Sequence, residues 1–133
     1  YHLGLKGHSD GDVIIHALID SLLGACKLKD IGTLFSDKKI KYKNIRSYKM
    51  LNRVLDMIKK KKYFINNVDI NVITEKPKIS KYRNKIVSSI SSLCNIKKNQ
   101  INLKGKTAEK LGLIGKERAI SCEVVTSVIR YDD

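Results

Sequence analysis

The sequence of 133 residues carries a formal net charge of +14, with 42% hydrophobic and 30% charged residues. This composition is typical of a single globular domain over residues 1–133 and excludes a disordered chain, which would hold too few apolar residues to form a core. No apolar run approaches the roughly 18 residues that a membrane-spanning helix requires, so we expect no membrane partner. The cysteines Cys26, Cys94 and Cys122 are far apart, and we expect core residues rather than a disulfide framework.

The first predicted element is a helix over residues 10–27. Ser9 is suited to cap its N-terminus, with Asp12 completing a capping-box pattern. Asp12, His16 and Asp20 follow at intervals of four, which places them in one polar line on a helix that is otherwise almost wholly apolar. One hypothesis is a metal site with an imidazole ligand and supporting carboxylates. The alternative is a polar line that faces solvent and caps the helix.

The N-terminus of the same helix is a second candidate site. His8 and Ser9 lie where free backbone N–H groups and the helix dipole favour a phosphate group. The alternative is that these two residues only cap the helix.

Hydrophobic periodicity predicts the remaining elements in chain order. Residues 28–43 have no clean period and predict a long loop, and Pro77 interrupts the chain after a strand. We expect a helix over 47–62, a strand over 66–74, a helix over 79–93, a strand over 101–107, a polar turn over 107–118 and a strand over 119–131. This order predicts an α/β (α+β sandwich) fold in which helices pack on one face of a mixed sheet.

The positive charge favours an anionic partner, which could be a phosphorylated metabolite, a nucleic acid or an acidic surface. A basic nucleic-acid-binding module is the alternative function, supported by the lysine run over 59–62. Aromatic residues make up only 6% of the chain, and no interleaving of basic and aromatic residues suggests base stacking. We therefore expect no nucleic-acid partner.

Three segments carry a resemblance to a known family. They read HSDGDVIIHALIDSLLGACKLKDIGTLFSD over 8–37, NVDINVITEKPKI over 67–79 and KTAEKLGLIGKERAISCEVV over 106–125. Together they resemble 2-C-methyl-D-erythritol 2,4-cyclodiphosphate synthase over nearly the whole chain. The resemblance implies a lyase of non-mevalonate isoprenoid biosynthesis. In that reaction the 2-phosphate of 4-diphosphocytidyl-2-C-methyl-D-erythritol 2-phosphate attacks the β-phosphorus, and CMP leaves.

The resemblance implies a catalytic and metal-binding set. His8 and Thr107 would stabilise the transition state. His16 would bind one Zn²⁺ per subunit, and Glu109 would help to hold Mg²⁺ or Mn²⁺ on the substrate diphosphate. Joining two polyanions requires positioning and neutralisation of charge, a task that suits such cations. Asp12 and Asp20 would only support the metal site.

The resemblance also implies a substrate-binding set that belongs to a turn, a loop over the methylerythritol end, a cytidine pocket and a phosphate-binding segment. Its members are Ser9, Asp30, Ile31, Gly32, Phe35, Ser36, Asp37, Lys38, Lys39, Thr74, Glu75, Lys76, Pro77, Lys78, Ile79, Ser80, Lys106, Thr107, Glu109, Leu113 and Lys116. Lys116 departs from the arginine that is common in the family.

A second departure concerns the zinc ligands. The family has two more in an Asp-x-His pair on an N-terminal strand, and this sequence contains no such pair. We expect that strand to precede Tyr1, with a non-catalytic homologue as the alternative. The resemblance further implies a homotrimer with active sites between subunits. The bias toward Lys, Asn and Ile suggests a plastid-type organelle, an apicoplast, with the bacterial cytoplasm as the alternative.

Overall fold

The structure is a computed structural model that describes residues 8–35, 46–75, 79–107 and 120–131, with the backbone alone described for 8–10. The described elements are α1 (His8–Ala25), α2 (Ile31–Leu34), α3 (Ser47–Lys60), β1 (Tyr63–Ile73), the 3-10 turn η2 (Ile79–Lys81), α4 (Arg83–Cys94), the 3-10 turn η3 (Lys98–Gln100), β2 (Ile101–Lys106) and β3 (Ser121–Arg130). No helix in these ranges is long and apolar enough to cross a membrane.

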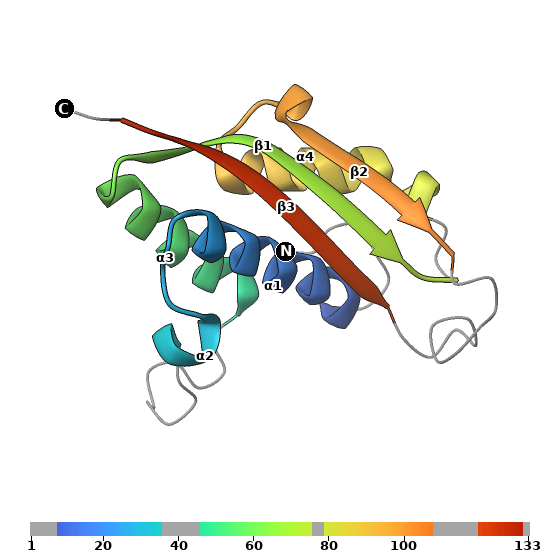
Figure 1. The fold of residues 1–133 in the computed structure, drawn as a ribbon. Coiled ribbons are helices and arrows are strands. Elements are labelled where there is room, and N and C mark those ends of the chain that lie inside the picture. The colour runs from blue at the N-terminus through green and yellow to red at the C-terminus, as the bar shows by residue number, and fades with distance from the viewer. Residues whose placement is uncertain (1–7, 36–45, 76–78, 108–119, 132–133) are drawn as a thin grey trace.

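The described strands form a mixed sheet with β1 at its centre. β2 pairs with β1 in parallel, in a register that aligns Val68 with Ile101, and β3 pairs with β1 antiparallel, with Ile70 opposite Val124. Figure 1 shows the helices gathered on one side of this sheet, where α1 packs against β3 and α4 against β2. The predicted α+β fold, a mixed sheet with packed helices, is confirmed.

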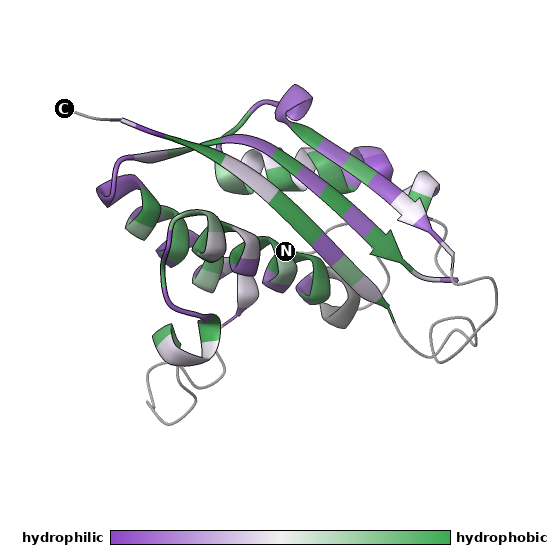
Figure 2. Ribbon diagram, in the orientation of Figure 1, coloured by the Kyte–Doolittle hydropathy of each residue, from purple (hydrophilic) through white to green (hydrophobic). Residues whose placement is uncertain are grey.

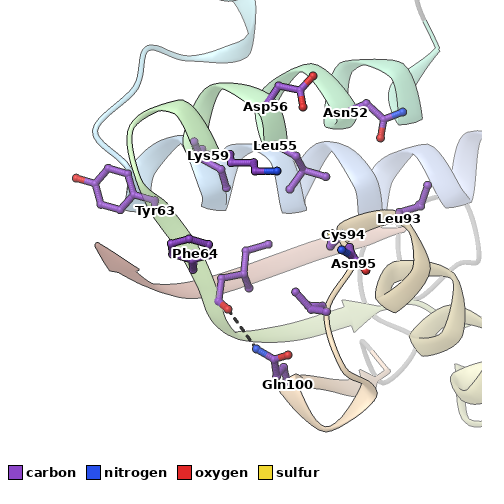
Figure 3. Close-up of a pocket in the computed structure, with 13 residues that line it drawn as sticks. Asn52, Leu55, Asp56, Lys59, Tyr63, Phe64, Leu93, Cys94, Asn95 and Gln100 are labelled. Atoms are coloured by element: carbon purple, nitrogen blue, oxygen red, sulfur yellow. Dashed lines mark hydrogen bonds between the residues drawn. The ribbon is translucent and has the colours of Figure 1, made fainter. Parts of the chain in front are cut away.

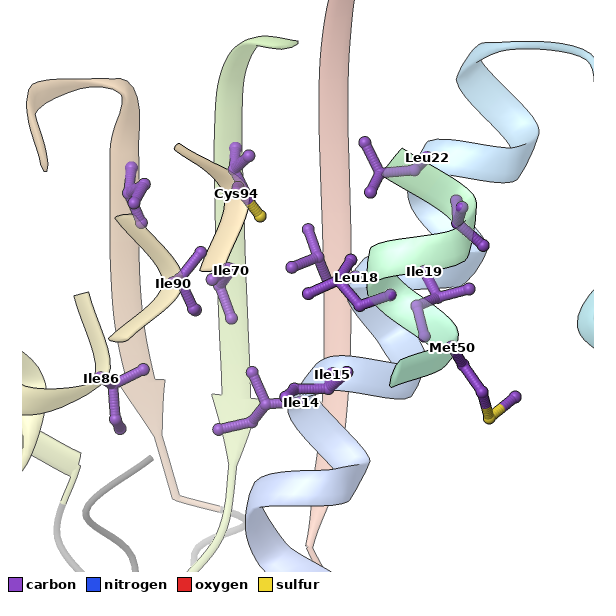
Figure 4. Close-up of a cluster of buried hydrophobic side chains, with 14 of the residues drawn as sticks. Ile14, Ile15, Leu18, Ile19, Leu22, Met50, Ile70, Ile86, Ile90 and Cys94 are labelled. Carbon is purple, nitrogen blue, oxygen red and sulfur yellow. The ribbon is translucent and has the colours of Figure 1, made fainter. Parts of the chain in front are cut away.

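The core lies between the sheet and these helices. Val68, Ile70 and Val72 of β1 are fully buried, and they alternate with polar residues as the hydropathy colouring in Figure 2 shows. Figure 4 shows α1 side chains and the α4 residues Ile86 and Ile90 converging on this layer. The buried apolar α1 residues are Ile14, Ile15, Leu18, Ile19, Leu22 and Leu23, and Cys26 is buried directly after the helix. Burying each large apolar side chain stabilises the fold by about 1.5–3 kcal/mol, which explains why α1 is so apolar.

The boundaries of α1 differ from the prediction. It begins at His8 rather than at residue 10, so Ser9 lies inside the helix and not before it. It ends at Ala25, because Lys27 adopts a left-handed conformation with φ 57°. The Leu28 amide then donates to the Leu23 carbonyl at 2.8 Å, which satisfies the end of the helix in a Schellman motif.

After α1, the observed elements differ from the predicted ones in three places. α2 lies inside the segment predicted to be a loop, because Asp30 caps a single helical turn. β1 begins at Tyr63, three residues before the predicted strand, because Lys62 turns the chain directly after α3 with φ 68°. The predicted helix over 79–93 is divided into η2 and α4. The helical turn α2 and the 3-10 turn η2 are each closed by local hydrogen bonds, which hydrophobic periodicity does not predict.

The left-handed Lys27 provides a prediction about stability. A residue with a Cβ is strained at φ 57°, whereas glycine adopts this conformation freely. We therefore expect Lys27→Gly to raise the free energy of unfolding by about 0.5–1 kcal/mol in urea denaturation. Lys29→Gly, at an exposed position without a positive φ, should give no gain. A loss of stability in Lys27→Gly would contradict the strain argument.

Candidate functional site

A cavity of about 350 Å³ opens beside the carboxyl ends of β1 and β2. Because these strands are parallel, the residues that follow them meet at one edge of the sheet, the usual position for a binding site in such sheets. The Thr74 amide donates to the Lys106 carbonyl at 3.0 Å and holds the two chain segments together. The cavity is lined by Thr74, Glu75, Ile79, Ser80, Arg83, Leu103, Gly105, Lys106 and Thr107.

The cavity combines an apolar surface with a polar rim. Ile79 and Leu103 are buried, and Gly105 allows β2 to approach η2 closely, because a Cβ on it would lie 2.9 Å from the Ile79 Cβ. Arg83 and Lys106 are exposed, whereas Glu75 is half-buried. Two cations and one carboxylate give the described lining a positive balance, which favours a ligand with a flat apolar part and a phosphate group.

Six of the residues assigned to the substrate by resemblance line this cavity together. They come from two segments about 30 residues apart in the sequence: Thr74, Glu75, Ile79, Ser80, Lys106 and Thr107. Sequence reasoning missed Arg83, Leu103 and Gly105. The glycine could have been found, because an isolated glycine in a strand pattern often marks a close approach of another segment. Arg83 has no motif around it that would have drawn attention.

The polar line of α1 lies away from this cavity lining. His16 and Asp20 are exposed, and Asp12 is half-buried. The Ser47 hydroxyl, buried at the first residue of α3, donates a hydrogen bond to the Asp12 carboxylate. This carboxylate therefore stands near the N-terminus of α3, where negative charge is favourable. Asp12 links the two helices.

The polar line of α1 does not by itself form a complete metal site among the described residues. Within the described ranges, no three His, Cys, Asp or Glu side chains gather closely enough to hold a metal ion. His16 offers one accessible imidazole, of the type that zinc prefers. The described residues therefore fit one ligand of a zinc site and do not close one.

The predicted substrate turn at Asp30 has a structural role. The Asp30 carboxylate accepts from the Thr33 amide at 3.1 Å and caps α2. This hydrogen bond holds the pKa of Asp30 below its ordinary value. Ile31 is half-buried and Gly32 is exposed, whereas Phe35 is buried and packs into the core.

Several predicted residues are placed only in part or lie outside the described residues. His8 and Ser9 have their backbone in the first turn of α1. The predicted residues outside the described ranges are Ser36, Asp37, Lys38, Lys39, Lys76, Pro77, Lys78, Glu109, Leu113 and Lys116.

A second cavity of about 630 Å³ lies between α3, the start of β1 and the end of α4 (Figure 3). Leu55, Phe64 and Leu93 make it largely apolar, and no residue predicted for the site lines it. Burial raises the pKa of its Cys94 thiol to about 12, so the thiol is protonated at neutral pH and is a poor nucleophile.

The face of the sheet opposite α1 carries exposed apolar side chains. The Thr126 hydroxyl of β3 is hydrogen-bonded to the Ser21 hydroxyl of α1, so the Thr126 side chain points toward α1. Successive side chains of a strand point to opposite faces, so Val125 and Ile129 point away from α1. Val125 is 72% exposed and Ile129 54%, and Phe64 lies opposite Ile129 in the register. On the same face, the Asn71 Oδ1 atom is buried without a hydrogen-bond partner among the described residues. Such a face is typical of a protein interface.

Comparisons with known proteins agree on one family. The YgbB family model matches residues 1–129. The chain is 57% identical, over 98% of its length, to a bifunctional IspD/IspF enzyme of Pelagibacter ubique, of which it spans 35%. It is 52% identical, over 97% of its length, to the 2-C-methyl-D-erythritol 2,4-cyclodiphosphate synthase of Wigglesworthia glossinidia brevipalpis, of which it spans 82%.

Solved structures agree with these relatives. A structure described as the CDP complex of IspF from Plasmodium falciparum is 46% identical and has a TM-score of 0.79, over 96% of this chain and 76% of that one. A second structure, of 2C-methyl-D-erythritol-2,4-cyclodiphosphate synthase with bound CDP, is 28% identical with a TM-score of 0.83, over 97% and 89% of the two chains.

Proposed function

This chain belongs to the YgbB family, and on that premise we propose that it converts 4-diphosphocytidyl-2-C-methyl-D-erythritol 2-phosphate to 2-C-methyl-D-erythritol 2,4-cyclodiphosphate and CMP. The predicted resemblance and the prediction of an enzyme are confirmed by relatives that carry the synthase name at about 50% identity. These relatives do not support the alternative of a nucleic-acid-binding module.

The lining of the cavity beside β1 and β2 is the observation that supports this proposal at the level of residues. The cavity beside β1 and β2 joins an apolar surface, formed by Ile79 and Leu103, to a rim with Lys106 and Thr107. A nucleotide has the same division, with a flat base at one end and phosphates at the other. The structures with bound CDP belong to proteins similar to this chain, which supports a cytidine nucleotide as the occupant.

The reaction is a transfer of one phosphoryl group within the substrate. An oxygen of the 2-phosphate forms a bond to the β-phosphorus, while the bond from that phosphorus to the oxygen bridging the two diphosphate phosphorus atoms breaks. The bridging oxygen leaves with CMP. Because both reacting groups are anions, the chain must orient them and offset their repulsion. Lys106 supplies positive charge at the rim, and Thr107 supplies a hydroxyl that can donate to a phosphoryl oxygen.

The metals belong to the same proposal. His16 would be one ligand of zinc, and Glu109 would hold a magnesium or manganese ion near the diphosphate. When bound, these cations would offset the negative charge that develops on the phosphoryl oxygens. His8 would stabilise the same charge from the first turn of α1. Asp12 and Asp20 would have supporting roles only.

We also propose a homotrimer with active sites between subunits. The exposed apolar residues Phe64, Val125 and Ile129 support self-association through the face of the sheet that points away from α1. In such an assembly, the cavity of one subunit would meet His16 of the next, which would explain why the two are separate in one chain. The relatives include an apicoplast synthase of Plasmodium falciparum and bacterial synthases, so both proposed compartments have precedents.

Release of CMP tests the proposed reaction. The full-length protein, supplied with zinc and magnesium, should release CMP from the diphosphocytidyl 2-phosphate substrate and form one cyclic diphosphate for each CMP. The matched control is the same substrate without its 2-phosphate, which lacks the attacking oxygen and should release none. CMP release from both compounds would indicate hydrolysis by water, and release from neither by a folded protein would contradict the proposed activity.

A further inference from the structure

Ser47 carries a buried hydroxyl that joins α3 to the first turns of α1. Its side chain is 3% exposed at the first residue of α3, and it donates a hydrogen bond to the half-buried carboxylate of Asp12. Arg46, the N-cap residue of α3, makes no side-chain capping hydrogen bond. The Asp12 carboxylate is therefore both the acceptor for Ser47 and the negative charge that the α3 dipole favours. This contact is a charge-assisted link between the two helices.

Asp12 lies between two residues that carry the proposed function. His8 precedes it by four residues and His16 follows it by four, so the three positions lie on one side of α1. The described buried apolar side chains of α1 begin at Ile14, after Asp12. The first turn of a helix lacks part of its internal hydrogen bonding and frays readily. The contact with Ser47 therefore anchors α1 at the end that precedes its described core packing.

We propose that Ser47 is a positioning residue for the cyclisation and acts through Asp12. This step rests on the proposed function, in which His8 and His16 serve the charge that develops during phosphoryl transfer. A displacement of about 1 Å at the reacting groups can cost about 100-fold in rate. Without the Ser47 hydroxyl, the first turns of α1 lose this link to α3, and both histidines lose their fixed position. Because Ser47 is buried, it acts without contacting the substrate.

The test compares the full-length protein with Ser47→Ala and with Ser21→Ala as the matched control. The Ser21 hydroxyl also ties α1 to another element, because it is hydrogen-bonded to the Thr126 hydroxyl of β3 at 2.7 Å. It lies about two and a half turns beyond Asp12, away from the first turns of the helix. Measured are kcat and KM for CMP release, the dissociation constant for CMP by calorimetry, and stability in urea.

We expect Ser47→Ala to lower kcat by about tenfold and to change KM and CMP binding by less than about twofold. CMP binding should persist because the cavity beside β1 and β2 includes no residue of α1 or α3 among its described lining. Ser21→Ala should lower stability and keep kcat. A double-mutant cycle tests the route through Asp12: Ser47→Ala should cause little further loss of kcat in an Asp12→Ala background.

Four outcomes overturn the inference. These are a normal kcat in folded Ser47→Ala, a parallel loss of kcat and CMP binding, an equal loss of kcat in Ser21→Ala, and a full additional loss in the Asp12→Ala background. The second would show a general loss of structure, and the fourth would show that Ser47 does not act through Asp12. Wild-type protein that binds no CMP and releases none contradicts the proposed function itself. Active wild-type protein with a normal kcat in Ser47→Ala contradicts only the role of Ser47.

Discussion

His16→Ala is expected to reduce CMP release by at least about 100-fold while leaving the fold intact. The side chain is exposed in the described structure, so its removal creates no cavity in the core. His16 supplies the one described imidazole on the α1 polar line, and loss of a zinc ligand should lower metal content and turnover together. Rates are measured by CMP release, and zinc per chain by elemental analysis.

The control for this variant lies two turns further along the same helix. Gly24→Ala changes an exposed α1 position where an added Cβ meets no atom within 4 Å. It should leave zinc content and CMP release unchanged. His16→Ala protein that keeps full zinc content and normal turnover would show that the polar line only faces solvent, the alternative that residue spacing leaves open.

The sequence predicted the fold well because strong periodicities determine it. In α1, apolar residues fill nearly every position outside the polar line, and the β1 residues Val68, Ile70 and Val72 alternate with polar ones. These patterns survive in the structure because burial is the dominant stabilising force. The errors arose where one hydrogen bond or one left-handed residue decides the local structure. The Asp30 cap that starts α2 and the left-handed Lys27 and Lys62 are examples.

The site was predicted through its resemblance to a family, and spacing alone would not have found it. Thr74 and Thr107 are more than 30 residues apart, and only the parallel pairing of β1 with β2 brings their segments together. Periodicity predicts strands but not which strands pair. Arg83 and Gly105 were missed for the same reason, because they come to line one cavity only where segments far apart in the sequence meet in space.

Gly105→Ala is expected to disturb the candidate site from its apolar side. An added Cβ would lie 2.9 Å from the Ile79 Cβ, and 3.4 Å and 3.5 Å from its two γ-carbons. The Ile79 Cβ is fixed to the backbone of η2, so β2 or η2 must move to relieve the overlap. We expect a loss of about 1–3 kcal/mol in the free energy of unfolding, measured in urea. The same shift should raise the dissociation constant for CMP.

Two comparisons separate this steric effect from a general effect of replacing glycine. Gly24→Ala adds the same methyl group inside a helix with open space around it, and it should stabilise the protein by up to about 1 kcal/mol. Combining Gly105→Ala with Ile79→Gly removes the Cβ contact and both γ-carbon contacts, so the added methyl group should cost less there than in the wild-type background. If Gly105→Ala costs nothing and CMP binding is unchanged, the close approach of β2 to η2 does not shape the cavity. A reduced cost in the Ile79→Gly background would instead show that the loss of stability comes from the contact between these two residues.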